Sequence, residues 1–127
     1  MTSHGNFHWN ELKTKDIEQA KKFYADTIGW TFAGMDMGEN GTYWIAMDGE
    51  KPVAGMYAMI EDQIQNDTEG WTGYISVDDI DMRIAKAKQA GATVIAEPFD
   101  IPGTGRIAIL VEPGGARIGW MTPSEDG

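Results

Sequence analysis

The chain has 127 residues, no cysteine and a formal net charge of −10, from 10 Lys and Arg against 20 Asp and Glu. This length predicts a single domain over residues 1–127. The lack of cysteine excludes disulfides, thiolate metal sites and a thiol nucleophile, and is compatible with the cytoplasm, where we expect the protein. The negative charge disfavours nucleic acid as a partner, and no apolar run is long enough to predict a membrane span.

An internal repeat divides the chain. Trp9 recurs as Trp71 at an offset of 62 residues, and Gly55 recurs as Gly119 at an offset of 64. Two modules of similar plan are therefore predicted. The predicted segments are a first module over 7–60, an acidic linker over 61–70 and a second module over 71–122.

The first module begins with an alternating run over 7–14, which predicts a strand. Asp16, followed three residues later by Gln19, favours a capped helix start, and Gly29 suits the left-handed end of that helix. The helix is expected to bury one stripe, formed by Ile17, Ala20, Phe23, Thr27 and Ile28. Three more strands are predicted over 30–35, 41–47 and 52–60, with Asp48-Gly49 as a hairpin turn.

The second module repeats this order. A strand is predicted over 71–77, and Asp78 or Asp79 can cap the helix that follows, which Gly91 ends. Its buried stripe is expected to be Ile80, Ile84, Ala87 and Ala90. Strands are predicted over 93–98, 106–111 and 116–122. The whole pattern is strand, helix and three strands, twice, which indicates an α+β protein.

A series of short motifs follows the repeat from residue 7 to residue 122. They are Trp9-Asn10-Glu11-Leu12, Asp16, Phe23-Tyr24, Gly29-Trp30, Trp71, Val77-Asp78-Asp79, Pro98, Pro102-Gly103, Gly105-Arg106 and Gly114-Gly115-Ala116. In order and spacing they resemble the vicinal oxygen chelate superfamily, which includes glyoxalase I, bleomycin-resistance proteins and extradiol dioxygenases. The resemblance implies paired βαβββ modules that form a curved, eight-stranded, cupped sheet, commonly in a homodimer.

The resemblance also implies where a metal would be held. In metal-using relatives, the first and last strands of each module each give one ligand, and these positions correspond here to Trp9, Gly55, Thr72 and Gly119. None carries imidazole or carboxylate, whereas a catalytic divalent ion needs about three such donors. We therefore expect no metal and no other cofactor, with a Zn, Ni, Mn or Fe ion as the alternative. Shifting the first strand by one residue would bring His8 to a ligand position, but would turn Leu12 away from the core.

Strand alternation predicts which side chains face the cup. Glu11 should face it together with Trp9, because Leu12 must face the helix. Glu11 could pair with a base such as Arg117, which we favour, orient a ligand, or act as a catalytic base. Gly55 and Gly119 leave room for a bulky molecule or for the Trp9 ring. The candidate ligand-binding residues are Trp9, Glu11, Gly55, Tyr57, Thr72, Tyr74, Arg117 and Gly119.

These features lead to one main functional hypothesis. We expect metal-independent binding of a small molecule, such as the sequestration of a cationic or aromatic compound, by a homodimer. The alternative is an enzyme. It would be either a glyoxalase-type, metal-dependent lyase, isomerase or dioxygenase, or a metal-free acid-base catalyst that uses Glu11.

Overall fold

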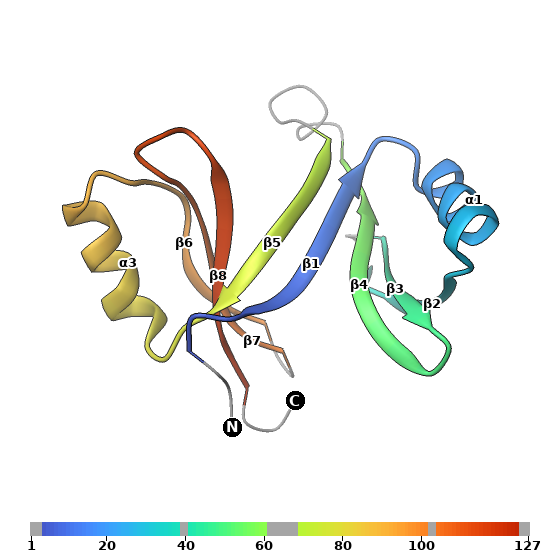
Figure 1. Ribbon diagram of the computed structural model, residues 1–127, viewed down its shortest axis with the longest axis horizontal. Helices are drawn as coiled ribbons and strands as arrows, with labels where there is room; N and C mark the ends of the chain where they lie inside the picture. The colour runs from blue at the N-terminus through green and yellow to red at the C-terminus, as the bar shows by residue number, and fades with distance from the viewer. Residues whose placement is uncertain (1–3, 39–40, 61–68, 102–103, 125–127) are drawn as a thin grey trace. The chain divides into compact units, whose positions relative to one another are not determined.

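The structure, a computed structural model, describes residues 4–38, 41–60, 69–101 and 104–124. The chain forms two compact units: residues 9–71, and residues 72–127 together with residues 1–8. Among the described residues, each half of the chain contributes a strand, a helix and three further strands in that order (Figure 1). This order confirms the expected α+β class of paired βαβββ modules.

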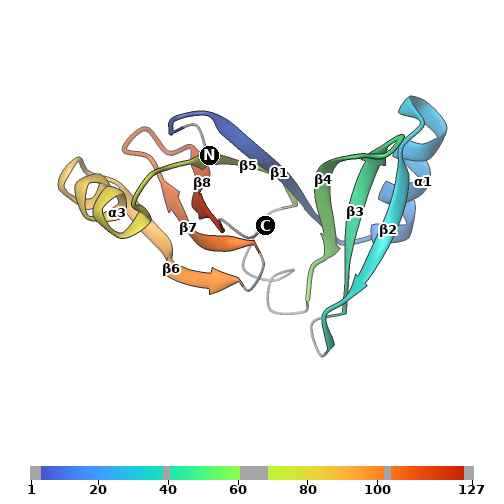
Figure 2. The same cartoon turned by 90° about the horizontal axis from the view of Figure 1, so that it is seen from below.

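The first module contains β1 (Phe7–Thr14), α1 (Ile17–Ile28), β2 (Thr31–Asp36), β3 (Thr42–Asp48) and β4 (Lys51–Ala58). Its strands are hydrogen-bonded in the order β2-β3-β4-β1. Strands β2, β3 and β4 are antiparallel, and β1 runs parallel to β4. Figure 2 shows β2, β3 and β4 side by side, with α1 on one side of them.

Helix α1 begins and ends as the sequence predicted. The Asp16 carboxylate accepts a hydrogen bond from the backbone N–H of Gln19 at 3.0 Å, and Gly29 takes the left-handed conformation with φ 81°. A helix start needs such an acceptor because its first N–H groups have no partner within the helix.

The expected buried stripe of α1 is only partly correct. Phe23 and Ile28 are 57% and 59% exposed, and Thr27 is exposed as well. Tyr24 packs against the core instead, with its ring centroid 5.1 Å from that of Trp30. The stripe therefore follows positions 17, 20 and 24, which lie on one narrow face of a helix.

The core of this unit lies between α1 and one face of its sheet. Leu12 is buried there with Ala46, Ala54 and Met56, as expected for a side chain that faces the helix. At the edge of this core, the Lys21 ammonium lies 3.2 Å from the centroid of the Trp44 ring. This cation–π contact lets the lysine cover apolar surface while it keeps its charge.

A β-bulge interrupts the β3–β4 hairpin. Met47 pairs with Pro52, but the next pair is Ala46 with Ala54, so β4 contains one extra residue, Val53. Because side chains alternate along a strand, this insertion changes which β3 side chains share a face with each β4 residue.

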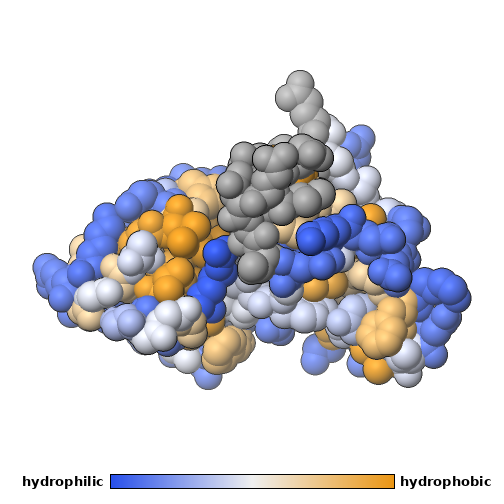
Figure 3. Space-filling model, turned by 90° about the horizontal axis from the view of Figure 1, so that it is seen from above, coloured by the Kyte–Doolittle hydropathy of each residue, from blue (hydrophilic) through white to orange (hydrophobic). Residues whose placement is uncertain are grey.

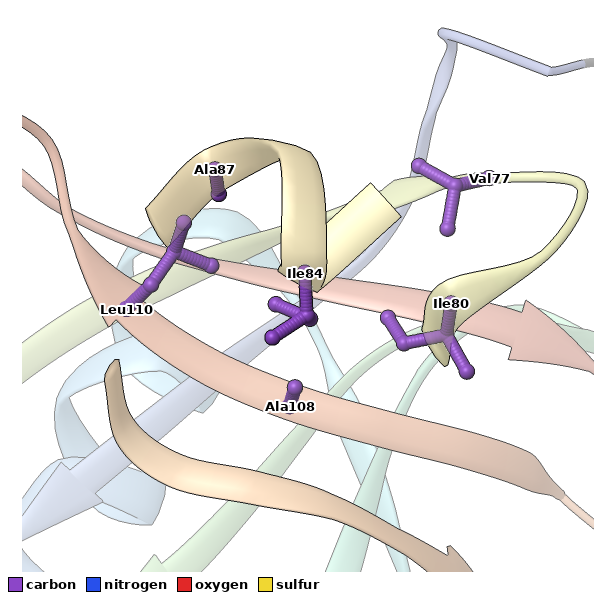
Figure 4. Packing of buried hydrophobic residues seen from close by; sticks show 6 residues of the cluster. All are labelled: Val77, Ile80, Ile84, Ala87, Ala108 and Leu110. Carbon is purple, nitrogen blue, oxygen red and sulfur yellow. The ribbon is translucent and has the colours of Figure 1, made fainter. Parts of the chain in front are cut away.

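The second module contains β5 (Gly70–Ser76), α3 (Ile80–Gln89), β6 (Thr93–Ile101), β7 (Gly105–Val111) and β8 (Arg117–Pro123). Its strand order is β5-β8-β7-β6, with β5 parallel to β8. Asp79 caps α3 by accepting from the Met82 N–H at 3.2 Å. The core of this unit is formed by side chains of α3 and β7, with one from the segment before α3 (Figure 4). They are Ile80, Ile84 and Ala87 of α3, Ala108 and Leu110 of β7, and Val77. Ala90 is exposed, so the last member of the expected stripe is wrong.

Thr14 connects two chain segments that are distant in sequence. Its carbonyl accepts from the Met59 N–H at 2.8 Å, and its hydroxyl donates to the Glu69 carboxylate at 2.7 Å. Glu69 also accepts from the Lys15 N–H at 2.8 Å. These hydrogen bonds, that of Lys15 first, lower the pKa of Glu69. The rest of the predicted linker up to residue 68 lies outside the described residues, as does Pro102-Gly103.

Some large apolar side chains are exposed. Figure 3 shows apolar side chains in patches among hydrophilic ones. The exposed ones are Phe7, Phe23, Ile28, Met35, Met37, Ile60, Trp71, Met82, Ile95 and Phe99. Within the described ranges, the helices are too short or too polar to cross a membrane.

Candidate functional site

In the first module, the face of the strands opposite α1 carries a group of aromatic and charged side chains. Strand alternation puts Trp9 and Glu11 of β1 on this face, because Leu12 points to α1. Register pairs Glu11 with Gly55 of β4, and Tyr57 of β4 with Tyr43 of β3. Gly55 is buried. The other members of this face are half-buried, so parts of their side chains are accessible to a small molecule; they are Trp9, Glu11, Tyr43 and Tyr57.

A chain of two hydrogen bonds runs across this face. The Trp9 indole Nε1–H donates to the Tyr43 hydroxyl oxygen at 3.1 Å. The Tyr43 hydroxyl donates in turn to Glu11 Oε2 at 2.9 Å. Tyr43 therefore reaches from β3 across β4 to two side chains of β1, and its hydroxyl is used both as a donor and as an acceptor.

Gly55 makes this crossing possible. A Cβ atom built on Gly55 would overlap the hydroxyl end of the Tyr43 side chain. Any other residue at position 55 would therefore compete with Tyr43 for the same space. Tyr57 adds a second ring, stacked on Tyr43 with centroids 6.4 Å apart and an interplanar angle of 24°. The result is a group of three aromatic rings beside one carboxylate.

The electrostatics keep Tyr43 neutral. Burial raises the pKa of its phenol far above the usual value near 10, and the Glu11 carboxylate raises it further. The Tyr43 hydroxyl thus keeps its proton over the whole physiological range and stays a donor to Glu11. Lys13, two residues after Glu11, lies on the same face by strand alternation and is 8% exposed.

The second unit contains a similar glycine and tyrosine pair. Tyr74 of β5 is opposite Gly119 of β8, and a Cβ atom on Gly119 would overlap the Tyr74 ring. Tyr74 is 4% exposed. The nearby Ser76 hydroxyl is buried and has no hydrogen-bond partner among the described residues. The two pairs are alike in packing, because each glycine leaves room for the side chain of a tyrosine on the neighbouring strand.

The structure therefore brings the candidate residues together in two sets. Trp9, Glu11, Gly55 and Tyr57 lie on one face of the first unit. Tyr74 and Gly119 are in contact in the second unit, where Thr72 is half-buried and Arg117 is exposed at the start of β8. The expected pairing of Glu11 with Arg117 joins residues of different units and stays a prediction.

The residues at the ligand positions do not fit a divalent metal. The indole of Trp9 is occupied in a hydrogen bond to Tyr43, and the space beside Gly55 is filled by the same tyrosine. Glu11 is the carboxylate of this group, whereas a catalytic ion needs about three imidazole or carboxylate donors. Over the part of the chain that the structure describes, no three His, Asp or Glu side chains come together as a metal site.

Tyr43 is the residue of this group that the sequence did not identify. A regular hairpin at Asp48-Gly49 would pair Tyr43 with Met56 and turn it toward α1. The bulge at Val53 turns it to the other face. The signal that could have found it is the alternation of β4, where Gly55 and Tyr57 lie on one face and need a large partner from the neighbouring strand.

Comparison with known proteins shows one family over most of the chain. The family model for the Glyoxalase/Bleomycin resistance protein/Dioxygenase superfamily matches residues 6–119. The putative glyoxylase CFP32 of Mycobacterium bovis is 37% identical over 120 residues, which cover 94% of this chain and 45% of that protein. The anthracycline biosynthesis protein DnrV of Streptomyces peucetius is 31% identical over 121 residues, which cover 87% of this chain and 44% of that protein. The chain thus spans less than half the length of these curated relatives.

Solved structures share the fold. The hypothetical protein BH1468 from Bacillus halodurans has a TM-score of 0.72 at 18% identity, with 98% of this chain and 99% of that chain covered. Methylmalonyl-CoA epimerase from Mycobacterium tuberculosis has a TM-score of 0.68 at 15% identity, with 98% and 93% covered. At such identities the likeness concerns the fold alone.

Proposed function

Because the chain belongs to the glyoxalase/bleomycin resistance protein/dioxygenase superfamily, we propose that it binds a small organic molecule without a metal ion. The proposed site is the face of the first unit that carries Trp9, Glu11, Tyr43 and Tyr57. The observation that supports this proposal is the hydrogen-bonded chain from Trp9 through Tyr43 to Glu11. Tyr43 engages the Trp9 indole and fills the space beside Gly55, and these are two of the positions that the family resemblance assigns to metal ligands.

The chemistry of this face favours a cationic or aromatic ligand. Aromatic rings offer flat apolar surfaces for stacking, and a half-buried carboxylate attracts a positive charge or a hydrogen-bond donor. The net charge of −10 adds a long-range attraction for cations. Two relatives are named for the biosynthesis of anthracyclines, which are flat polycyclic compounds, and this agrees with such a ligand.

Sequestration is the simplest activity for such a site. Holding a compound requires affinity for its ground state, whereas catalysis requires tighter binding of a transition state. In the second unit, we propose that Tyr74 and Gly119, with Thr72 and Arg117, also contribute ligand contacts.

Titration with an anthracycline, followed by the fluorescence of the compound and by calorimetry, tests the proposal. We expect saturable binding that is the same before and after treatment of the protein with a chelator. Glu11→Gln should weaken it by about tenfold or more, because a hydrogen bond to a charged group is lost. Asp26→Asn, on the exposed side of α1, is the matched control and should bind like the wild type. Absence of binding by anthracyclines and by a panel of other cationic aromatic compounds would overturn the proposal.

An acid-base enzyme is the second candidate, because Glu11 is a half-buried carboxylate whose orientation is set by the hydrogen bond from the Tyr43 hydroxyl. In this case Glu11 would remove a proton from carbon next to a carbonyl group. Incorporation of solvent deuterium into carbonyl compounds, followed by NMR and lost in Glu11→Gln, would support this function over sequestration. Stoichiometric Zn, Ni, Mn or Fe in protein purified without chelator would instead favour the metal-dependent enzyme.

We also propose that the protein acts as a homodimer in the cytoplasm. Members of this superfamily commonly form dimers, and the absence of cysteine agrees with a reducing compartment. Sedimentation equilibrium at micromolar protein concentrations tests the dimer. A measured mass equal to that of a single chain at these concentrations would contradict it.

A further inference from the structure

Strand β2 lies at one end of the strand order, where among the described strands it pairs with β3 alone. Its other edge therefore presents backbone N–H and C=O groups that have no strand beside them. Apart from the half-buried Phe32, every residue of β2 is exposed, which indicates that the described helices and loops leave this edge open. Such an edge is a template for pairing with another strand.

Strand β6, at the other end of the strand order, is built differently. Pro98 has no N–H to offer, and the register with β7 shifts between Val94 and Ala96 and again between Ala96 and Phe99. Prolines, bulges and lysines are the usual features that keep an edge strand from pairing. Strand β2 has an unbroken register with β3 and contains no proline or lysine. Of these two edge strands, β2 is thus the one that is suited to pairing.

The hydrogen-bond pattern identifies which residues of β2 point outward. The Met37 N–H donates to the Gly41 carbonyl at 2.7 Å, so these two residues form a hydrogen-bonded pair at the end of the antiparallel ladder. Hydrogen-bonded pairs recur at every second residue, which directs the backbone groups of the odd-numbered residues of β2 toward β3. The backbone groups of Phe32, Gly34 and Asp36 therefore point toward the open edge.

We propose that β2 is the subunit interface of the homodimer, and that it pairs antiparallel with β2 of a second copy about a two-fold axis at Gly34. This inference rests on the proposed homodimer. The edge of an antiparallel strand is complementary to itself under a two-fold rotation, so a second copy fits it. With the axis at Gly34, Phe32 pairs with Asp36 and Gly34 pairs with its own copy, so all the outward residues are used.

Charge does not oppose this pairing at the strands. Two copies repel each other at long range, because each has a net charge of −10, but salt screens this repulsion. Asp36 is the charged residue of β2. In the proposed register it lies opposite Phe32 of the second copy and not opposite the other Asp36. Like charges directly opposite each other, which destabilise a strand pair, are thus avoided.

The side chains beside the edge add to the contact. Phe32 packs against the core on the α1 side, so strand alternation places Ala33 and Met35 on the opposite face. Met35 is 51% exposed and would lie opposite Ala33 of the second copy, which would bury part of its apolar surface. Met35 also pairs with Tyr43 of β3, so the proposed interface lies next to the candidate site. The pairing uses the open edge of both copies and therefore closes at two chains.

Two lysine variants test this interface. Met35→Lys places an ammonium group in the contact and should raise the dissociation constant of the dimer at least about tenfold in sedimentation equilibrium. Ile95→Lys is the matched control, because Ile95 is equally exposed, at 51%, on the edge strand β6. It should dimerise like the wild type. Each variant adds one positive charge, so a general electrostatic effect would act on both alike.

Cysteine cross-linking tests the register, since the chain has no cysteine of its own. Ala33 and Met35 of the two copies face each other as a pair without hydrogen bonds, which is the closer of the two cross-strand geometries. An oxidised mixture of Ala33→Cys and Met35→Cys chains that carry tags of different mass should therefore give mainly the disulfide between the two variants. A disulfide mainly between two Ala33→Cys chains would move the axis to residue 33 and overturn the register.

The outcomes separate the interface from the dimer beneath it. If the wild type has the mass of a single chain, the homodimer is wrong, and the interface with it. If Met35→Lys keeps the wild-type dissociation constant, or if Ile95→Lys weakens the dimer as much, with native circular dichroism in both, the β2 interface is overturned and the homodimer stands. Absence of every disulfide in a mixture that is dimeric by sedimentation also overturns the β2 interface.

Discussion

Gly55→Ala provides the most direct perturbation of the group. The added methyl would overlap the Tyr43 hydroxyl, so Tyr43 must leave both Trp9 and Glu11. A hydrogen bond to a carboxylate contributes about 1.5–3 kcal/mol and a neutral one about 0.5–1.5 kcal/mol, so the loss should be about 2–4 kcal/mol. For a chain of this length that lowers the Tm by roughly 7–15 °C, measured by calorimetry or by circular dichroism at 222 nm.

A double-mutant cycle isolates the cause. In a Tyr43→Ala background the same glycine substitution meets no hydroxyl and should change the free energy of unfolding by less than about 0.5 kcal/mol, because the coupled partner is gone. Gly114→Ala is the control, since a Cβ atom there contacts nothing. An equal cost of Gly55→Ala with and without Tyr43 would show that the clash is not the cause.

Three further outcomes are expected. Gly119→Ala should lower the Tm by several degrees, because its Cβ would overlap the Tyr74 ring, and this loss should largely vanish in Tyr74→Ala. Leu12→Ala should cost about 2–5 kcal/mol in urea unfolding, and a cost below about 1 kcal/mol would contradict its place in the core. Two hydrogen bonds from the Arg83 guanidinium lower the pKa of Asp78. The ionised Asp78 therefore stabilises the folded protein above about pH 4, and this contribution is lost as the pH falls through the lowered pKa. Asp78→Asn should flatten the acid side of the stability profile, and an unchanged profile would rule out this contribution.

The sequence predicted the features that depend on local chemistry. The repeat, the order of elements and the cap of α1 follow from turn residues and periodicity, and the structure confirms them. Gly29 could be assigned because a helix end in the left-handed region favours a residue without a side chain. The signals for helix caps and turns lie within a few residues of the feature that they predict, so a single sequence is sufficient to identify them.

The features that depend on register were less predictable. Tyr43 reaches the candidate site only because of the single extra residue in β4, and the Asp48-Gly49 turn by itself predicts a regular hairpin without that bulge. The choice between Phe23 and Tyr24 for the buried face of α1 depended on Trp30 and Trp71, whose rings lie 5.1 and 5.8 Å from that of Tyr24. The first feature depends on the register between two strands, and the second depends on which aromatic rings pack against the helix, so neither could be determined from the periodicity of one segment.

The two hydrogen bonds of Thr14 have a consequence for how β4 and β5 are positioned. The end of β4 and the beginning of β5 are each fixed by their own bond to this one residue, through Met59 and Glu69. The carbonyl of Thr14 thus holds one strand end beside β1 and its hydroxyl holds the other, so only the second of these links would be lost if the threonine hydroxyl were removed.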